Sequence, residues 1–289
     1  MSGMVSISSY STLVPVADLV AHIADPSWRV FDCRHDLGDT GYGERAYAKE
    51  HIPGALFLHL DRDMSGAKNG TNGRHPLPDP EVFAARMAAC GVGPDTQVVA
   101  YDNEGSAFAA RLWWMLRWLG HNKVAVLDGG LAGWRRAKQP MDNVVPTVAP
   151  AQFTPQLRGE NRVLLAEMQS RLGEPEAVLL DARPEERFTG EEETVDPVAG
   201  HIPGSVNRFY YDNLDDAGCY FRPAEELRQE FDGLLAGRPA SCLIHTCGSG
   251  VTACQNVLAM EVAGLPGSRL YAGSWSEWCS DPARPVETT

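Results

Sequence analysis

One cysteine in a glycine-rich segment carries the clearest chemical signal in this sequence. Cys247 follows a short apolar run at 242–246, typical of a buried strand, and precedes Gly248-Ser249-Gly250 and a run typical of a helix start. Glycines let a turn curl so that successive N–H groups point inward, and a helix N-terminus adds partial positive charge. We therefore expect the Cys247 thiol to be largely thiolate near neutral pH and to act as a nucleophile.

The same loop argues against phosphate-ester chemistry. Phosphatases with a cysteine loop of this kind place an arginine six residues after the cysteine, and that position holds Ala253. N–H groups without a guanidinium suit a small, polarisable anion carried by the sulfur itself. A persulfide fits this description, because it forms when the thiolate attacks a sulfur donor and is consumed when the sulfur passes to an acceptor.

An internal repeat predicts the elements that position this loop. The segment His-Ile-Pro-Gly at 51–54 returns at 201–204, and the apolar run before Asp102 matches the one before Cys247. The copies lie about one domain length apart, so we expect a tandem duplication, with a non-catalytic domain at 1–145 and a catalytic domain at 146–289. The proline- and valine-rich stretch 138–160 is predicted to link them. Because the half without a nucleophile shares the His-Ile-Pro-Gly segment, its histidines are predicted to be structural.

Each half alternates strand patterns with helix patterns, which predicts parallel sheets covered by helices. The expected strands span 28–32, 97–101, 123–127, 177–180, 241–246 and 269–271. The expected helices span 13–23, 80–90, 107–119, 164–172, 223–235 and 252–263. Ligands of such sheets bind at the carboxyl ends of the strands, where Cys247 stands. The tryptophan-rich run 113–118 has helical spacing and is predicted to pack in the core.

Composition narrows the range of partners. The 289 residues carry a formal net charge of −13, which disfavours nucleic acid and anionic membranes, so an anionic substrate needs a local basic pocket. No apolar run reaches the ~20 residues of a membrane-spanning helix, and residues 1–10 lack the pattern of a signal peptide. The seven cysteines form no CxxC pair and no zinc-type cluster with histidine. We therefore expect free thiols, no metal, no organic cofactor and a cytoplasmic location.

The loop sequence CGSGVT at 247–252 resembles the active-site loop of 3-mercaptopyruvate sulfurtransferases, two-domain members of the rhodanese superfamily. Thiosulfate sulfurtransferases typically carry CRKGVT instead. The resemblance extends over nearly the whole chain and implies an α/β fold of two tandem rhodanese-like domains, each a mainly parallel central sheet flanked by helices. It implies that Cys247 takes a sulfur atom from 3-mercaptopyruvate, releasing pyruvate, and passes it to cyanide, a small thiol or a thioredoxin-type acceptor.

The resemblance also assigns roles to individual residues. It implies that the backbone N–H groups of the loop hold the persulfide, namely those of Gly248, Ser249, Gly250, Val251 and Thr252. It implies that the Ser249 hydroxyl acts near the leaving group together with His75 and Asp61 from the first domain.

The donor's carboxylate requires a cation, and Arg187 matches the family's substrate arginine. The family's second arginine is missing, because Thr194 stands where it is expected. Arg74, Arg208 and Arg222 are the candidates to replace it in space.

Two alternative functions stay open. Thiosulfate is the alternative donor, with sulfite as the product; the missing second arginine favours it, whereas the loop without an Arg-Lys pair disfavours it. The other alternative is a non-enzymatic carrier, in which Cys247 ferries persulfide sulfur to a partner protein.

Overall fold

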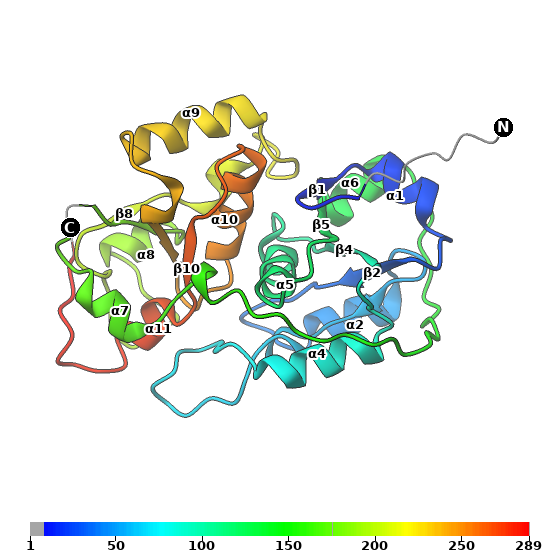
Figure 1. Cartoon of the computed structure of the whole chain (residues 1–289), viewed down its shortest axis with the longest axis horizontal. Helices are drawn as coiled ribbons and strands as arrows, with labels where there is room; N and C mark the ends of the chain where they lie inside the picture. The colour runs from blue at the N-terminus through cyan, green and yellow to red at the C-terminus, as the bar shows by residue number, and fades with distance from the viewer. Residues whose placement is uncertain (1–8, 175, 289) are drawn as a thin grey trace.

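The computed structural model describes residues 9–174 and 176–288, so most of the segment assessed for a signal peptide lies outside the described residues. Two sheets of five parallel strands form the framework (Figure 1). The first sheet has the order β1-β5-β4-β2-β3. Its strands are β1 (Leu13–Val14), β2 (Trp28–Asp32), β3 (Leu56–Phe57), β4 (Gln97–Tyr101) and β5 (Val124–Leu127).

The second sheet repeats this design. Its order, β6-β10-β9-β7-β8, is that of the first sheet strand for strand, and all its pairs are parallel. Its strands are β6 (Arg162–Val163), β7 (Val178–Asp181), β8 (Ser205–Asn207), β9 (Leu243–Thr246) and β10 (Arg269–Tyr271). The predicted tandem α/β fold is confirmed, and β9 of the second domain corresponds to β4 of the first.

Helices connect the strands in both halves. In the first half these are α1 (Val16–His22), α2 (Tyr42–Lys49), α3 (Leu60–Asp63), α4 (Pro80–Ala89), α5 (Ala107–Trp118) and α6 (Gly130–Arg136). In the second half they are α7 (Leu165–Ser170), α8 (Glu185–Thr189), α9 (Ala224–Leu235), α10 (Ala253–Val262) and α11 (Ser274–Trp278). Short 3₁₀ turns stand at Gly159–Asn161, Tyr210–Asn213 and Ala240–Cys242.

Two predicted boundaries were wrong. The helix expected over 13–23 begins only at Val16, because Leu13 and Val14 form an edge strand paired with β5 and the extended Pro15 separates the two. The strand expected from 241 begins at Leu243, since the residues before it form a 3₁₀ turn.

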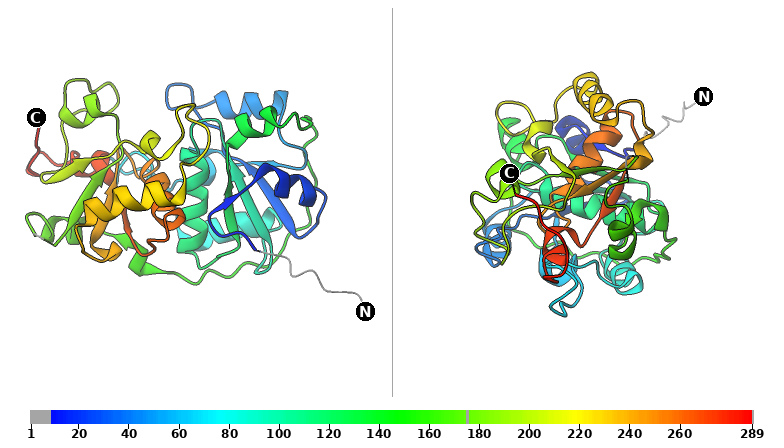
Figure 2. Two further views of the ribbon diagram at one scale, coloured as in Figure 1. Left: turned by 90° about the horizontal axis from the view of Figure 1, so that it is seen from above. Right: turned by 90° about the vertical axis from the view of Figure 1, so that its left-hand side faces the viewer.

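The two domains share one core. On β4 the side chains of Val98 and Ala100 join a cluster that includes residues of both domains, whereas those of Val99 and Tyr101 face a separate cluster on the outer side. Helices α5 and α10 lie side by side between the two sheets (Figures 1 and 2). The tryptophans of α5 are buried there, which confirms the packing predicted for the run 113–118. The shared core therefore fixes the loops of one domain relative to those of the other.

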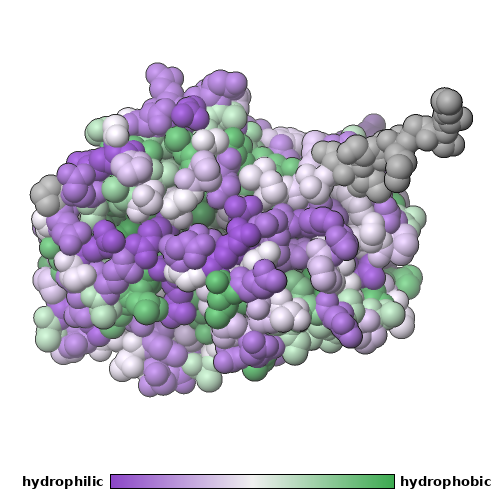
Figure 3. Space-filling model, in the orientation of Figure 1, coloured by the Kyte–Doolittle hydropathy of each residue, from purple (hydrophilic) through white to green (hydrophobic). Residues whose placement is uncertain are grey.

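The stretch that joins the domains runs along their flank without strands or α-helices between Arg136 and β6, apart from one 3₁₀ turn. It is held by backbone hydrogen bonds, such as that from the Gln156 N–H to the Leu119 carbonyl at 2.8 Å. On the face shown in Figure 3, hydrophilic residues predominate and hydrophobic ones occur in small groups between them. Within the described residues, none of the helices has the length and apolarity to cross a membrane.

Candidate active site

Cys247 lies directly after β9, at the carboxyl end of the second sheet, on the wall of a cavity of about 330 Å³. Its side chain is buried, and the Gly250 N–H donates a hydrogen bond to its sulfur at 3.1 Å. The Cys247 N–H donates to the Ser274 hydroxyl at 3.1 Å. The cavity is formed by both domains: Phe108 and Glu104 come from the first, Tyr210 and Cys247 from the second.

Gly250 is the residue that lets the loop turn its N–H toward the sulfur. Its φ of +73° lies in the left-handed region, which favours glycine. A Cβ atom added to it would lie 2.2 Å from the Ala272 carbonyl oxygen, so the loop must pack there without a side chain. Gly248, Ser249, Val251 and Thr252 line the cavity.

The first domain shows that this type of loop binds an anion. Asp102 occupies the position equivalent to Cys247, and its buried carboxylate accepts four backbone N–H groups, those of Glu104, Ser106, Phe108 and Ala109, at 2.8–2.9 Å. The loop of the first domain is therefore filled by its own carboxylate. In the second domain the equivalent position carries a sulfur, and the cavity beside it is open to a substrate.

Ser249, His75 and Asp61 lie together across the domain interface. His75 Nδ1 is 2.7 Å from the Ser249 hydroxyl oxygen, and His75 Nε2 is 3.6 Å from a carboxylate oxygen of Asp61. The carboxylate favours a proton on Nε2, which leaves Nδ1 as the acceptor for the Ser249 hydroxyl. The sequence resemblance named these three residues, and the fold brings all three beside the cysteine loop.

The charge state of this group follows from its burial. Burial, and after it the positive charge of Arg74, lowers the pKa of His75 to about 3, so the imidazole is neutral at physiological pH. Burial alone would raise the pKa of Asp61, but the hydrogen bond from Lys68 lowers it overall. The group therefore consists of a neutral histidine between a serine hydroxyl and a carboxylate.

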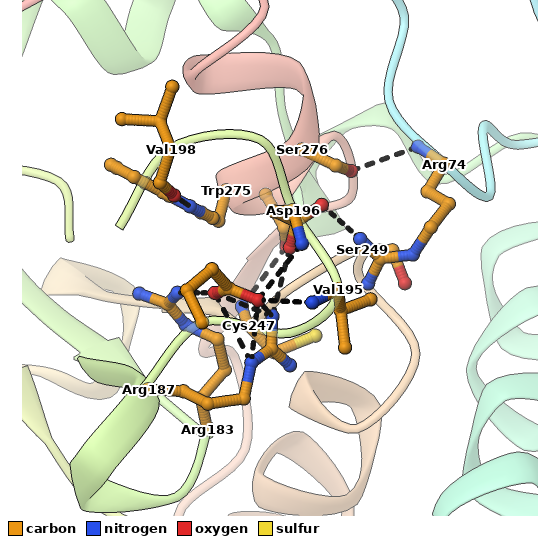
Figure 4. Close-up of polar contacts among 12 residues, drawn as sticks. Arg74, Arg183, Arg187, Val195, Asp196, Val198, Cys247, Ser249, Trp275 and Ser276 are labelled. Atoms are coloured by element: carbon orange, nitrogen blue, oxygen red, sulfur yellow. Dashed lines mark hydrogen bonds and ion pairs between the residues drawn. The ribbon is translucent and has the colours of Figure 1, made fainter. Parts of the chain in front are cut away.

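Two arginines face each other beside the cysteine loop (Figure 4). Arg187 and Arg74 both line the cavity, and the space beside Gly248 Cα is within 4 Å of both guanidinium groups. Asp196 joins them: one oxygen accepts from Arg187 at 3.0 Å and the other from Arg74. Glu193 also binds Arg187, at 2.9 Å. Of the arginines named from the sequence as candidates for the donor's carboxylate, Arg187 and Arg74 therefore both lie at the cavity.

The other two candidates lie elsewhere. Arg208 is buried and binds Glu230 at 2.8 Å, and Arg222 binds Glu226 and the same Glu230. Neither lines the cavity. Thr194, which stands where the family's second arginine is expected, has its side chain exposed to solvent. It therefore supplies no cation to the cavity.

Two further arginines form buried ion pairs at the ends of strands. Arg34 binds Asp32 at 2.6 Å, and Arg183 binds Asp181 at 2.8 Å. The histidines of the two His-Ile-Pro-Gly segments are buried against backbone carbonyls. These contacts confirm the structural interpretation of the repeated segment.

Sequence reasoning missed Ser274. It has a φ of +53°, which is uncommon for a residue with a side chain, and its hydroxyl accepts the Cys247 N–H while donating to the Tyr271 carbonyl at 2.9 Å. The internal repeat could have pointed to this position, because its equivalent in the first domain is a glycine. That residue, Gly130, has a φ of +52°, close to that of Ser274.

A histidine cluster beside the site also went unnoticed in the sequence. His35, His59 and Asp61 place ligand-type atoms within 4.8 Å of one another. However, His59 Nδ1 accepts the N–H groups of Asp61 and Arg62, and its Nε2 lies 3.0 Å from the Thr40 carbonyl, to which it must donate. His59 therefore has no lone pair left for a metal ion.

Comparison with known proteins agrees with this arrangement. The model of the rhodanese-like domain family matches residues 15–137 and 164–281. A Pseudomonas aeruginosa protein named "Probable 3-mercaptopyruvate sulfurtransferase" is 48% identical over 97% of this chain and 99% of its own length. "Thiosulfate/3-mercaptopyruvate sulfurtransferase 1, mitochondrial" from Arabidopsis thaliana is 33% identical over 98% of this chain and 80% of its own. The crystal structure of SseA from Escherichia coli, described as a 3-mercaptopyruvate sulfotransferase, aligns with a TM-score of 0.80 and 33% identity over 93% of this chain and 100% of that one.

Proposed function

We propose, from the premise that this chain belongs to the rhodanese-like domain family and carries two such domains in tandem, that it is a sulfurtransferase whose donor is 3-mercaptopyruvate. The observation that carries the proposal is that Cys247 and Ser249 line one cavity with Arg74 and Arg187, while His75 lies 2.7 Å from the Ser249 hydroxyl. A dianionic donor such as thiosulfate would find no cation within the cysteine loop itself. A 2-oxo acid would find cations at its carboxylate and a proton relay at its reacting carbon.

Binding places the negatively charged carboxylate of the donor next to two positively charged arginines. The carboxylate of 3-mercaptopyruvate meets Arg74 and Arg187, in competition with Asp196 and Glu193, which hold these arginines in the absence of substrate. This contact directs the thiol of the donor toward Cys247. The two guanidinium groups come from different domains, so the donor is gripped across the interface.

The first half-reaction moves one sulfur atom and one proton. The Cys247 thiolate attacks the donor sulfur, a new S–S bond forms, and the C–S bond breaks with its electron pair moving onto carbon as the enolate of pyruvate. The proton of the donor thiol reaches that carbon through the Ser249 hydroxyl and His75. The Nδ1 atom of His75 lies 2.7 Å from the Ser249 hydroxyl oxygen. The products are pyruvate and a Cys247 persulfide anion, stabilised by the Gly250 N–H.

In the second half-reaction, the terminal sulfur of the persulfide leaves to a nucleophilic acceptor and the Cys247 thiolate is restored. Cyanide, a small thiol or a thioredoxin-type protein has the required chemistry.

We place the reaction in the cytoplasm, and we place the boundary between the non-catalytic and catalytic domains at residues 145 and 146, within the joining stretch. The cavity is formed by both halves, so neither half is complete alone.

The decisive test is steady-state sulfur transfer to cyanide, with 3-mercaptopyruvate and thiosulfate compared side by side and Cys247→Ser as the blank. We expect kcat/KM to favour 3-mercaptopyruvate by ~100-fold, equivalent to ~2.7 kcal/mol of differential transition-state binding. A preference for thiosulfate would contradict the assigned donor. Absence of turnover with either donor in the folded protein would favour the persulfide carrier, and activity in the serine variant would refute the mechanism.

A further inference from the structure

A buried arginine lies behind the cysteine loop without an acidic partner. Arg111 is on α5 of the first domain, and its side chain is fully buried. Among the described residues it forms no ion pair. Its Nη1 donates to the Gly250 carbonyl at 2.9 Å and its Nη2 to the His75 carbonyl at 3.0 Å, whereas its Nε has no partner. An uncompensated buried charge is costly, so a nearby anion is needed to offset it.

The two carbonyl groups belong to the two loops that carry the chemistry. The N–H of Gly250 is the donor to the Cys247 sulfur, and His75 is the partner of the Ser249 hydroxyl. One guanidinium from the first domain therefore fixes both loops at positions adjacent to the reacting groups. The planar fork of an arginine is suited to this, because its donors diverge in a fixed geometry.

The internal repeat provides a comparison within the same molecule. Gly105 is the first-domain equivalent of Gly250, and its carbonyl is also contacted from the helix of the opposite domain. The contact there is the neutral amide of Gln255, at 3.1 Å. That loop already contains the carboxylate of Asp102, fully hydrogen-bonded to four N–H groups. A cation thus faces the loop that carries the cysteine, and a neutral group faces the loop with an internal carboxylate.

We propose that Arg111 is a positioning residue for sulfur transfer, which fixes the cysteine loop and supplies the buried positive charge that stabilises the thiolate and persulfide anions of Cys247. The persulfide part of this inference rests on the proposed function, whereas the thiolate part does not. The electrostatics agree with it: burial lowers the pKa of Arg111, while the neighbouring thiols of Cys254 and Cys247 act to raise it.

The test is the pH dependence of alkylation of Cys247 by iodoacetamide, followed by mass spectrometry of the peptide that contains it. Arg111→Met keeps the length of the side chain but removes the charge, and Arg111→Lys keeps a charge without the fork. We expect the midpoint of the alkylation profile to rise by about one pH unit or more in Arg111→Met, and by less in Arg111→Lys. At a pH below both midpoints, each unit lowers the thiolate fraction about tenfold.

Gln255→Leu is the matched control, because it removes the equivalent hydrogen bond to the loop of the first domain. It should leave the alkylation midpoint of Cys247 where it is in the unaltered chain. An unchanged midpoint in folded Arg111→Met would overturn the proposal. Arg111 would then be a purely structural residue, whose substitution lowers only the melting temperature. Since alkylation requires no sulfur donor, a shifted midpoint in a protein without transferase activity would refute the proposed function while sustaining the role of Arg111 toward the thiolate.

If Arg111→Met does not fold, a thermal double-mutant cycle with Arg111→Gln, which removes the charge but keeps a polar side chain, and Cys247→Ser gives the answer. Replacing the thiolate by a neutral hydroxyl leaves the cation without its anion, so the cost of Arg111→Gln in melting temperature should be smaller in the serine background. Equal costs in both backgrounds would show that the charge on the sulfur and the guanidinium are not coupled.

Discussion

At the scale of single residues, the site uses arginines that the fold has already paired with acids. Asp196 and Glu193 hold Arg187, and Asp196 also holds Arg74, so the cations are oriented before a substrate arrives. Burial raises the pKa of Asp196, although Arg74 and Arg187 act to lower it. In the proposed binding mode, the donor's carboxylate therefore competes with a carboxylate of the protein for the hydrogen bonds of the two arginines.

Arg187→Met and Arg74→Met should each raise the KM for 3-mercaptopyruvate by about 10- to 100-fold, because hydrogen bonds to charged groups contribute about 1.5–3 kcal/mol. Arg222→Met is the control, since Arg222 pairs with glutamates away from the cavity. Initial rates over a range of donor concentrations give KM and kcat separately. A KM for Arg74→Met equal to that of the unaltered chain would show that Arg74 does not bind the donor's carboxylate.

At the scale of elements, the strand–loop–helix unit of β9 and α10 depends on one glycine conformation. The φ of +73° at Gly250 turns its N–H to the sulfur, and the Ala272 carbonyl occupies the space where a side chain would project. In the equivalent unit of β4 and α5, backbone N–H groups also surround an acidic group. That group is the carboxyl group of Asp102, which stands at the position equivalent to Cys247. The same local architecture therefore serves catalysis in one domain and stability in the other.

Gly250→Ala should reduce kcat/KM by about 100-fold or more, since loss of one N–H donor to a developing anion has an effect of this size. Gly237→Ala is the matched control: its φ is +84°, but nothing lies within 4 Å of an added Cβ. Both variants carry the left-handed penalty of about 1–2 kcal/mol for alanine, so chemical denaturation should show destabilisation in each. Normal activity in Gly250→Ala would contradict the assigned role of its N–H.

At the scale of the whole molecule, folding buries His75 and His245. His245 lies on β9 of the second sheet, and His75 lies at the contact between the two domains. Burial, then the charge of Arg74, lowers the pKa of His75 to about 3; burial, then the charge of Arg208, lowers that of His245 to about 3 as well. Unfolding restores values near 6.5. Between about pH 3 and 6.5 the unfolded chain thus binds more protons than the native protein, so the contribution of these neutral histidines is fully present above about pH 6.5 and is lost as pH falls.

The free energy of unfolding should therefore decrease from pH 7 to pH 5. His75 and His245 contribute a slope that approaches about 2.7 kcal/mol per unit for two protons, and His35 and His121, whose pKa values burial also lowers, add to it. His245→Leu should reduce that slope by about one proton, because it removes one buried imidazole whose ring nitrogens have no hydrogen-bond partner. Thr246→Val, at the next buried position of β9, should keep the slope. Urea titrations at several pH values measure it, and an unchanged slope in His245→Leu would show that His245 takes up no proton on unfolding.

The sequence by itself determined the duplicated α/β architecture, and it placed the predicted nucleophile, Cys247, at the carboxyl end of the second sheet. These follow from patterns between neighbouring residues: the run before Cys247, the glycines after it, and the alternation of strands and helices. The resemblance to a family added His75, Asp61 and Arg187, which are far apart in the chain and have no local signal of their own. Several predicted boundaries differ by one to three residues, among them those near Leu13 and Leu243, where a proline and a 3₁₀ turn interrupt the periodic pattern.

The tertiary structure decided which charges meet. Three arginines were equal candidates in the sequence, and only the packing of the first domain against the second brings Arg74 to the cavity while Arg208 and Arg222 pair with acids elsewhere. The same packing buries Arg111 behind the cysteine loop, a contact that joins residues 139 positions apart. Such contacts depend on burial and on the three-dimensional course of the backbone, because the free energy of a charge is set by its surroundings and not by its neighbours in the chain.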